Sequence, residues 1–192
     1  YCLPTHLEEL TKGHLVSEGM CPSSGIKNIK IEQDEGRFLI SATVDRHSPA
    51  ASNKLDSKMK MSSTDIRDAV KRLDEHSALF KKTGGAHVAQ ICDGRRSVYA
   101  EDVSRHCAID KVIGIALQSQ MDLTASALVT SCRQTASTVT KAIRCQIPVV
   151  LTISATTDLA VGTARKFGIT LIAFARGNRF NIYSHHERIT GA

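Results

Sequence analysis

The spacing of apolar residues divides this chain into a short N-terminal part and a longer main part. Residues 4–18 have the spacing of an amphipathic helix, and residues 26–33 and 37–44 alternate apolar and polar side chains around a short polar turn. Such alternation is typical of a β-hairpin with one buried face. Residues 47–61 are polar and aperiodic, which predicts an exposed loop. We therefore expect an N-terminal α+β appendage over residues 1–46.

The main domain, residues 62–192, begins with a helix and continues with alternating strands and helices. Ser62 followed by Asp65 resembles a capping box, and the helix it starts is predicted to run to about Lys82. The later elements are predicted at 87–92 and 97–101 (hairpin), 106–118 (helix), 125–130 (strand), 134–144 (helix), 148–153 (strand), 157–167 (helix), 170–174 and 180–184 (strands). This order predicts a three-layer α/β/α sandwich. An antiparallel last strand would make its sheet mixed.

Composition favours a globular protein without a membrane segment. The chain has 192 residues, of which 42% are hydrophobic and 23% charged. No apolar run approaches the ~20 residues that cross a bilayer, and the first residues do not form a signal peptide, so we expect a cytoplasmic protein with no membrane partner. The net charge of +6 is mild, and five Phe, three Tyr and no Trp offer few stacking surfaces. Nucleic acid is therefore disfavoured as a partner.

The six cysteines are scattered along the chain, and no CxxC pair is present. Closely spaced thiols would indicate a zinc or redox site, so these thiols are expected to be reduced and mostly part of the core. A zinc deaminase needs His-x-Glu and Pro-Cys-x-x-Cys. His87 is instead followed at the second position by Ala89, so no zinc is expected.

Three segments with ligand-binding chemistry follow or precede predicted strands, namely 83–87, 101–106 and 174–179. In open α/β sheets, ligands bind beyond the carboxyl ends of strands. The first segment contains two glycines that allow close backbone approach, and the last has Arg176 and Arg179 around a glycine turn, which suits phosphate. Each segment also has an ordinary structural interpretation as a turn, an ion-pair network or a solvated hairpin. Their joint position at the ends of strands favours the functional interpretation.

Several strings carry a resemblance to a known family. They are Leu7-Glu8-Glu9-Leu10, Ser17-Glu18-Gly19, Thr83-Gly84-Gly85-x-His87, Glu101-Asp102-Val103-x-Arg105-His106-x-Ala108-Ile109-Asp110-Lys111-Val112-Ile113-Gly114, Thr157-Asp158-Leu159-Ala160-Val161 and Phe174-x-Arg176-Gly177-x-Arg179-Phe180-Asn181-x-Tyr183. Together they resemble the formate dehydrogenase accessory protein (FdhD) family over nearly the whole chain. The resemblance implies a main domain similar in fold to cytidine deaminases.

The resemblance also implies a function in sulfur transfer. Family members receive a persulfide from a cysteine desulfurase and pass its sulfur to the bis-molybdopterin guanine dinucleotide cofactor of molybdenum or tungsten formate dehydrogenases. The implied partners are therefore a cysteine desulfurase, a formate dehydrogenase and the guanine nucleotide ends of the cofactor, with a second copy of the chain because family members are often dimers. The implied cofactor-binding residues are Phe174, Ala175, Arg176, Gly177, Asn178, Arg179, Gly84, Gly85, His87, Asp102, Arg105, His106, Asp110 and Asp158.

The chain departs from the family at its sulfur-carrying cysteines. The family places them in a CxxC-like motif in the loop that corresponds to residues 47–61, and that stretch contains no cysteine. Cys107 and Cys132 stand where the family has other residues and are candidate relocated sulfur carriers. Cys107 is expected in the first turn of a helix beside basic residues, which would lower its pKa. The alternative is a non-catalytic cofactor-binding chaperone or regulator that has lost sulfur transfer, so the sequence leaves open whether the chain is an enzyme.

Overall fold

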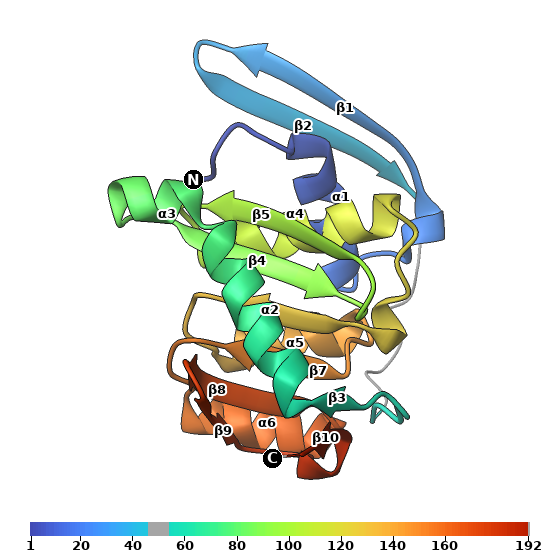
Figure 1. Cartoon of the computed structure of the whole chain (residues 1–192). Coiled ribbons are helices and arrows are strands. Elements are labelled where there is room, and N and C mark those ends of the chain that lie inside the picture. Colours follow the sequence, from blue (N-terminus) through green and yellow to red (C-terminus); the bar gives the residue numbers. More distant parts are fainter. Residues whose placement is uncertain (46–53, 192) are drawn as a thin grey trace.

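A six-stranded mixed sheet forms the centre of the protein (Figure 1). The computed structural model describes residues 1–45 and 54–191. The strands, in their order across the sheet, are β5 (Ser97–Asp102), β4 (His87–Cys92), β6 (Ala127–Thr130), β7 (Val149–Thr152), β8 (Thr170–Arg176) and β9 (Arg179–Ile182). Strands β6, β7 and β8 are parallel, whereas β4, β5 and β9 each pair antiparallel with their neighbours. The predicted mixed sheet is confirmed.

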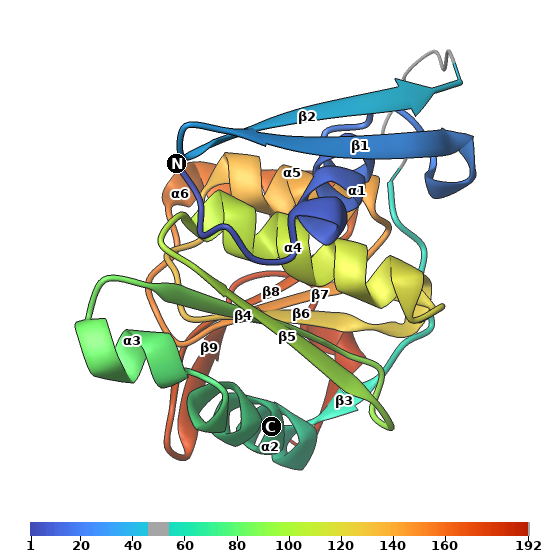
Figure 2. The same ribbon diagram turned by 90° about the horizontal axis from the view of Figure 1, so that it is seen from above.

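Helices cover both faces of this sheet (Figure 2). Helices α1 (Leu7–Ser17), α4 (Arg105–Gln118), α5 (Ala136–Arg144) and α6 (Asp158–Phe167) lie on one side, and α2 (Ser63–Glu75) and α3 (Ala78–Thr83) lie on the other. Side chains alternate along the buried strands, so that Leu128 and Val150 pack toward the first layer while Val129 and Leu151 pack toward α2. The predicted three-layer α/β/α sandwich is confirmed.

Helix α2 begins at the predicted capping box but ends earlier than predicted. The Ser62 hydroxyl accepts a hydrogen bond from the Asp65 backbone, and the Asp65 carboxylate accepts one from the Ser62 backbone. The prediction of one helix as far as Lys82 is wrong, because α2 ends at Glu75 and α3 starts at Ala78. The first free N–H groups of α3 donate to the carboxylate of Glu101 on β5. That long-range partner makes a second helix start possible.

Helices α1 and α4 cross in backbone contact. A Cβ atom added at Gly13 would overlap the carbonyl oxygen of Asp110, and one added at Gly114 would overlap the carbonyl oxygen of Glu9. Helix α1 therefore packs as part of the helical layer of the main domain. The predicted division of the chain near residue 46 stays a prediction, because residues 46–53 lie outside the described residues.

The N-terminal hairpin is more exposed than the alternation of its residues predicts. Strands β1 (Ile26–Asp34) and β2 (Arg37–Val44) form a separate two-stranded sheet. Ile31, Phe38 and Leu39 are exposed, so the prediction of a hairpin with one buried face is wrong for these residues. The apolar positions do alternate, but the hairpin extends away from the central sheet (Figure 1).

The segment predicted as an exposed loop is partly buried. Residues 47–53 of it lie outside the described residues. Of the remainder, Leu55 is only 5% exposed and its N–H donates to the carbonyl of Phe167, while Met61 is equally buried. Met61 starts the short strand β3 (Met61–Ser62), which pairs in parallel with β10 (Ile189–Thr190). The 3₁₀ turns are η1 (Ser23–Gly25), η2 (Leu123–Ala125) and η3 (His186–Arg188).

Candidate functional site

One edge of the central sheet brings the three predicted segments together. The parallel strands β6, β7 and β8 end at this edge, β5 also ends there, and β4 begins there because it runs antiparallel to both neighbours. His87 consequently pairs with Asp102 across β4 and β5. In Figure 1 this edge lies on the left, near α3 and the N-terminus. Segments 83–87 and 101–106 are therefore neighbours, and segment 174–179 lies at the same edge beyond the ends of β6 and β7, as the positions of all three at strand ends predict.

The loops that follow the three parallel strands are tied to one another at this edge. Gln134 donates its N–H to the carbonyl of Ala155, which joins the loops after β6 and β7. The N–H of Phe174 donates to Ser154, and Arg176 Nε donates to the Ile153 carbonyl at 2.9 Å. These bonds hold the end of β8 against the loop after β7, so the edge is a defined surface.

The β8–β9 turn presents two guanidinium groups beside an open hollow. Phe174, Arg176, Arg179 and Asn181 line a cavity of about 270 Å³. Phe174 has a positive φ of 55°, which is strained for an aromatic residue, and the residue is 43% exposed. Gly177 also has a positive φ, and open space surrounds it. The strained backbone holds an exposed ring next to two cations, an arrangement suited to a ligand with a planar base and phosphates.

A second group of cations surrounds His87 on the β4–β6 side of the edge. Burial lowers the pKa of His87, and the positive charges of Arg105 and Arg133 lower that pKa further. The pKa of His106 is likewise lowered, first by burial and then by Arg105. The Arg105 Nε atom is buried and has no hydrogen-bond partner among the described residues. A buried guanidinium donor without a partner, among other cations, favours an anionic ligand.

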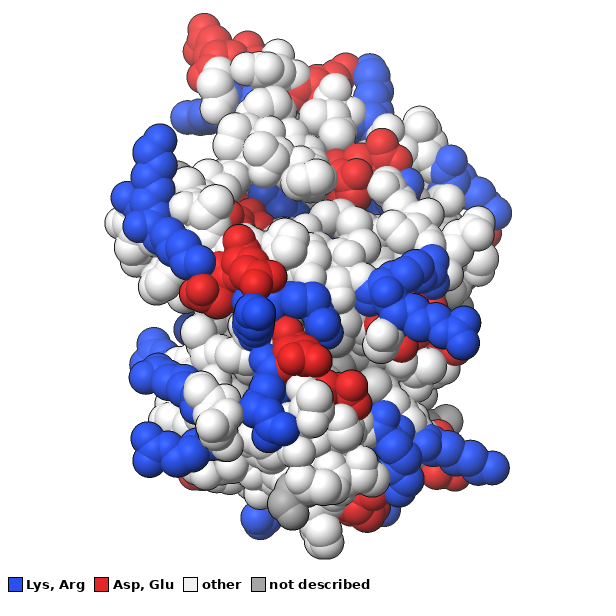
Figure 3. All heavy atoms as spheres, in the orientation of Figure 1, with Lys and Arg blue, Asp and Glu red and all other residues white. Residues whose placement is uncertain are grey.

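Basic side chains also project along this margin of the surface in Figure 3, whereas acidic and basic side chains alternate across the centre of the face. The excess of positive charge is therefore not gathered on that central region. None of the helices in the described part of the chain has the length and apolarity to cross a membrane.

Asp102 braces the edge from inside the protein. Its side chain is fully buried and forms an ion pair of 2.6 Å with the equally buried Lys111. The same carboxylate accepts hydrogen bonds from the backbone N–H groups of Leu3 and Ser104. The sequence leaves two roles open for Asp102, contact with a ligand or support of the turn. The contacts described here are all within the protein, so they favour support of the turn.

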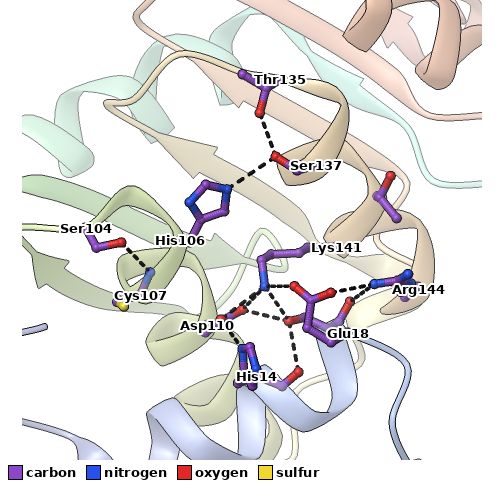
Figure 4. Close-up of polar contacts among 12 residues, drawn as sticks. His14, Glu18, Ser104, His106, Cys107, Asp110, Thr135, Ser137, Lys141 and Arg144 are labelled. Carbon is purple, nitrogen blue, oxygen red and sulfur yellow. Dashed lines mark hydrogen bonds and ion pairs between the residues drawn. The ribbon is translucent and has the colours of Figure 1, made fainter. Parts of the chain in front are cut away.

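Asp110 belongs to a buried charged network between α1, α4 and α5 (Figure 4). Lys141 approaches it at 2.8 Å, and His14 and Ser17 from α1 also bond to it. Burial opposes ionisation of Asp110, but the hydrogen bond from His14 and the charge of Lys141 outweigh it and lower the pKa of Asp110. Glu18 extends the network to Lys141 and Arg144. These contacts dock α1, so Asp110 faces the interior of the protein.

The remaining predicted residues lie at the surface of the edge. Gly84 caps α3 with a positive φ of 66°, and Gly85 is exposed beside it. His106 bonds to Ser137 at 3.3 Å (Figure 4). Asp158 is exposed in the first turn of α6. The structure thus brings the glycines and His106 near the cationic group, while Asp158 follows β7 at the same edge.

The two candidate sulfur carriers do not have the predicted reactivity. Burial raises the pKa of the Cys107 thiol, and the nearby charge of Asp102 raises it further, so the prediction of a lowered pKa is wrong. Cys132 is only 3% exposed, and burial raises its pKa as well. Neither thiol is an exposed, activated thiolate.

Several residues at this edge were missed by the sequence reasoning. Arg133 adds a cation beside His87, Asn181 lines the cavity at the β8–β9 turn, and Cys2 lies near Cys107. Arg133 directly follows the buried strand β6, so the strand-end rule could have found it. Cys2 gave no such signal. Within residues 1–45 and 54–191, no cluster of three or more His, Cys, Asp or Glu side chains could hold a metal ion.

The fold and the edge together define an α/β/α domain with basic side chains at the carboxyl ends of its parallel strands. The profile of the FdhD/NarQ family matches residues 40–190. The chain therefore belongs to the FdhD/NarQ family, as the resemblance in sequence predicts.

Individual relatives agree with this assignment. The chain is 32% identical to the sulfur carrier protein FdhD of Methanothermobacter thermautotrophicus, over 97% of this chain and 82% of the relative. It is 34% identical to the protein of the same name from Staphylococcus haemolyticus, over 98% and 81%. A crystal structure of a candidate formate dehydrogenase accessory protein from Desulfotalea psychrophila superposes with a TM-score of 0.85 at 29% identity, covering 98% of this chain and 81% of that one.

Proposed function

We propose that this protein assists the maturation of a formate dehydrogenase by holding the bis-molybdopterin guanine dinucleotide cofactor at the carboxyl edge of its sheet while sulfur is delivered. The names of its relatives, which are sulfur carrier proteins and a candidate formate dehydrogenase accessory protein, support the general function. The observation that carries the proposal is the pair Arg176 and Arg179 beside an exposed Phe174 around one cavity.

The residues at this edge fit the guanine and phosphate ends of such a cofactor. Arg176 and Arg179 offer planar donor groups for phosphate oxygens. The exposed ring of Phe174 offers a face on which a base can stack. On the other side of the edge, the buried and unpartnered Nε of Arg105 marks a donor that a second anionic group can satisfy. The two cationic groups suit a ligand with two phosphate-bearing ends.

When bound, the cofactor supplies the molybdenum or tungsten atom that accepts sulfur. The protein contributes binding and orientation. Its guanidinium groups neutralise phosphates, and His87 and His106, whose pKa values are lowered, stay neutral near neutral pH and can donate one hydrogen bond each. We take a cysteine desulfurase as the source of the sulfur and the formate dehydrogenase as its destination. A homodimer stays a prediction.

The second candidate function is a binding chaperone or regulator without sulfur transfer. It is favoured by the absence of cysteine from residues 47–61 and by the buried, high-pKa state of Cys132. The two functions share the cofactor site and differ in whether any cysteine of the chain receives sulfur.

The cofactor site is tested by titration calorimetry with GDP as a mimic of one cofactor end. We expect the double variant Arg176→Ala, Arg179→Ala to bind GDP at least about tenfold more weakly, because each charge-assisted contact contributes about 1.5–3 kcal/mol. Arg95→Ala is the matched control, since Arg95 is an exposed arginine in the β4–β5 turn at the other end of the sheet. Unchanged affinity in the double variant would refute the proposed site.

Sulfur transfer is tested separately by incubation with a cysteine desulfurase and cysteine, followed by persulfide labelling and mass spectrometry. A labelled cysteine supports the sulfur carrier. If no cysteine is labelled while GDP still binds, the chaperone or regulator is the correct function.

A further inference from the structure

Two of the six cysteines are partly exposed, and they lie close together. Cys2 and Cys107 are the partly exposed pair, whereas Cys21, Cys92, Cys132 and Cys145 are buried. None of the six is joined in a disulfide. The partly exposed pair is 105 positions apart in the chain, so only the fold brings its members together.

The N-terminal segment is fixed over the first turns of α4 on both sides of Cys2. The N–H of Leu3 donates to Asp102 at 3.0 Å, and the Lys111 ammonium donates to the Leu3 carbonyl at 3.0 Å. On the other side of Cys2, the Cys107 thiol approaches the Tyr1 carbonyl oxygen at 3.9 Å. That carbonyl is bonded directly to the nitrogen of Cys2.

Peptide geometry then limits the separation of the two cysteines. A carbonyl oxygen lies about 3 Å from the next Cα, so the Cα of Cys2 is within about 7 Å of the Cys107 sulfur. The charge of a Cys2 thiolate also contributes to the raised pKa of Cys107, which is consistent with two neighbouring sulfur atoms. Residues 1–6 form no helix or strand, so rotation of the Cys2 side chain can bring the two sulfurs closer while Leu3 stays bound to Asp102.

This thiol pair is next to the basic edge of the sheet. Arg105 and His106 occupy the same helical turn as Cys107, and the ring of His106 reaches Ser137 at the start of α5 (Figure 4). An anion formed at the two thiols would therefore be released beside cationic and neutral donor groups rather than into bulk solvent.

We propose that Cys2 and Cys107 form a sulfur-handling dithiol, in which Cys2 accepts a sulfane sulfur and Cys107 then displaces it as hydrosulfide at the basic edge. The inference rests on the proposed function of sulfur delivery and adds the residues that perform it. Cys2 has the role of acceptor because it lies outside helices and strands, where it can reach the cysteine of a donor. Cys107 is fixed in the first turn of α4 beside Cys2, which suits the second, intramolecular step.

The chemistry balances without a further oxidant. In the first step, the Cys2 thiolate attacks the outer sulfur of a donor persulfide, a new S–S bond forms, and the donor cysteine leaves as a thiolate. In the second, the Cys107 thiolate attacks the Sγ of Cys2, the Cys2–Cys107 disulfide forms, and hydrosulfide leaves. The two thiols lose two electrons, and the sulfane sulfur gains them. Two equivalents of a low-molecular-weight thiol then reduce the disulfide.

The experiment treats the full chain with glutathione persulfide, measures hydrosulfide release, and maps sulfur adducts and disulfides by mass spectrometry. We expect the wild-type chain to release hydrosulfide and to yield a Cys2–Cys107 linked peptide. Cys107→Ser should stop at a persulfide on Cys2 and lose hydrosulfide release. Cys2→Ser should lose both products. Cys21→Ser is the control and should behave as wild type, with circular dichroism confirming that each variant is folded.

Two results would overturn the inference. One is hydrosulfide release by Cys2→Ser at the wild-type rate, and the other is a wild-type chain that releases hydrosulfide without forming the linked peptide. Because glutathione persulfide replaces the desulfurase and no cofactor is present, the outcome is independent of the GDP titration. If the wild-type chain binds GDP but forms neither hydrosulfide nor the linked peptide, the dithiol alone is rejected. If the wild-type chain does not bind GDP, the proposed cofactor site is rejected.

Discussion

Removal of the charge of Asp102 should strongly destabilise the protein. In Asp102→Asn, the carbonyl oxygen of the amide can still accept from the backbone of Ser104. The amide nitrogen, however, takes the place of the oxygen that bonds to Lys111 and to the N–H of Leu3. Donors would then face donors, and a fully buried ammonium would lose its counter-ion.

The magnitude follows from the burial of both partners. Neither side chain of the Asp102–Lys111 pair is exposed to solvent, and breaking such a pair costs about 3–5 kcal/mol because an uncompensated charge stays buried. For a chain of this length, that corresponds to a fall in melting temperature of about 6–20 °C. The exposed pair of Lys12 and Glu8 is a matched comparison, and Glu8→Gln should cost less than about 1 kcal/mol.

Urea unfolding followed by circular dichroism measures these differences. The double variant Asp102→Asn, Lys111→Met should recover part of the loss, since no charge then stays buried, and a double-mutant cycle gives the coupling energy. A cost below about 1 kcal/mol for Asp102→Asn, equal to that of an exposed pair, would refute the reasoning. So would a double variant less stable than the sum of the two single variants predicts.

Three further predictions concern the helical layers. Gly114→Ala should destabilise the protein by about 1–3 kcal/mol or more in urea unfolding, because its methyl group would overlap the backbone of Glu9. The hydrogen bond to Asp110 raises the pKa of His14, so the stabilisation by His14 is present below its ordinary pKa of 6.5 and is lost as the pH rises through the higher folded value. His14→Gln should abolish that part of the pH dependence of unfolding. Ser62→Ala removes the N-cap of α2 and should cost about 1 kcal/mol, measured by thermal unfolding.

The sequence predicted most elements of the main domain because their apolar faces follow the period of a helix or a strand. Strands β6 and β7 are buried along their whole length, and α2 shows its apolar stripe and its capping box directly. The break between α2 and α3 could not be predicted, since Glu101, 20 or more residues away, holds the first N–H groups of α3. The exposure of the hairpin depends equally on which elements pack around it.

The candidate site was predicted in part for a similar reason. Strand ends mark the edge of an α/β sheet, so the segments around His87 and Arg176 were found from pattern alone. The roles of individual carboxylates were not predicted, because Asp102 and Asp110 differ from ligand-binding carboxylates only in the side chains that they contact. Those partners, Lys111 and Lys141, are recognisable after the fold places them at 2.6 and 2.8 Å.

The buried Asp102–Lys111 pair connects the family motif to the proposed dithiol. Asp102 and Lys111 belong to the string that carries the family resemblance, yet both are used to hold the backbone of Leu3 against α4. That contact fixes Leu3, and on the other side of Cys2 the Cys107 thiol approaches the Tyr1 carbonyl oxygen, so Cys2 lies beside Cys107. Asp102→Asn should therefore also weaken formation of the Cys2–Cys107 disulfide in molecules that remain folded. If Asp102→Asn folds and forms the disulfide at the wild-type rate, the Asp102–Lys111 ion pair does not position Cys2 beside Cys107.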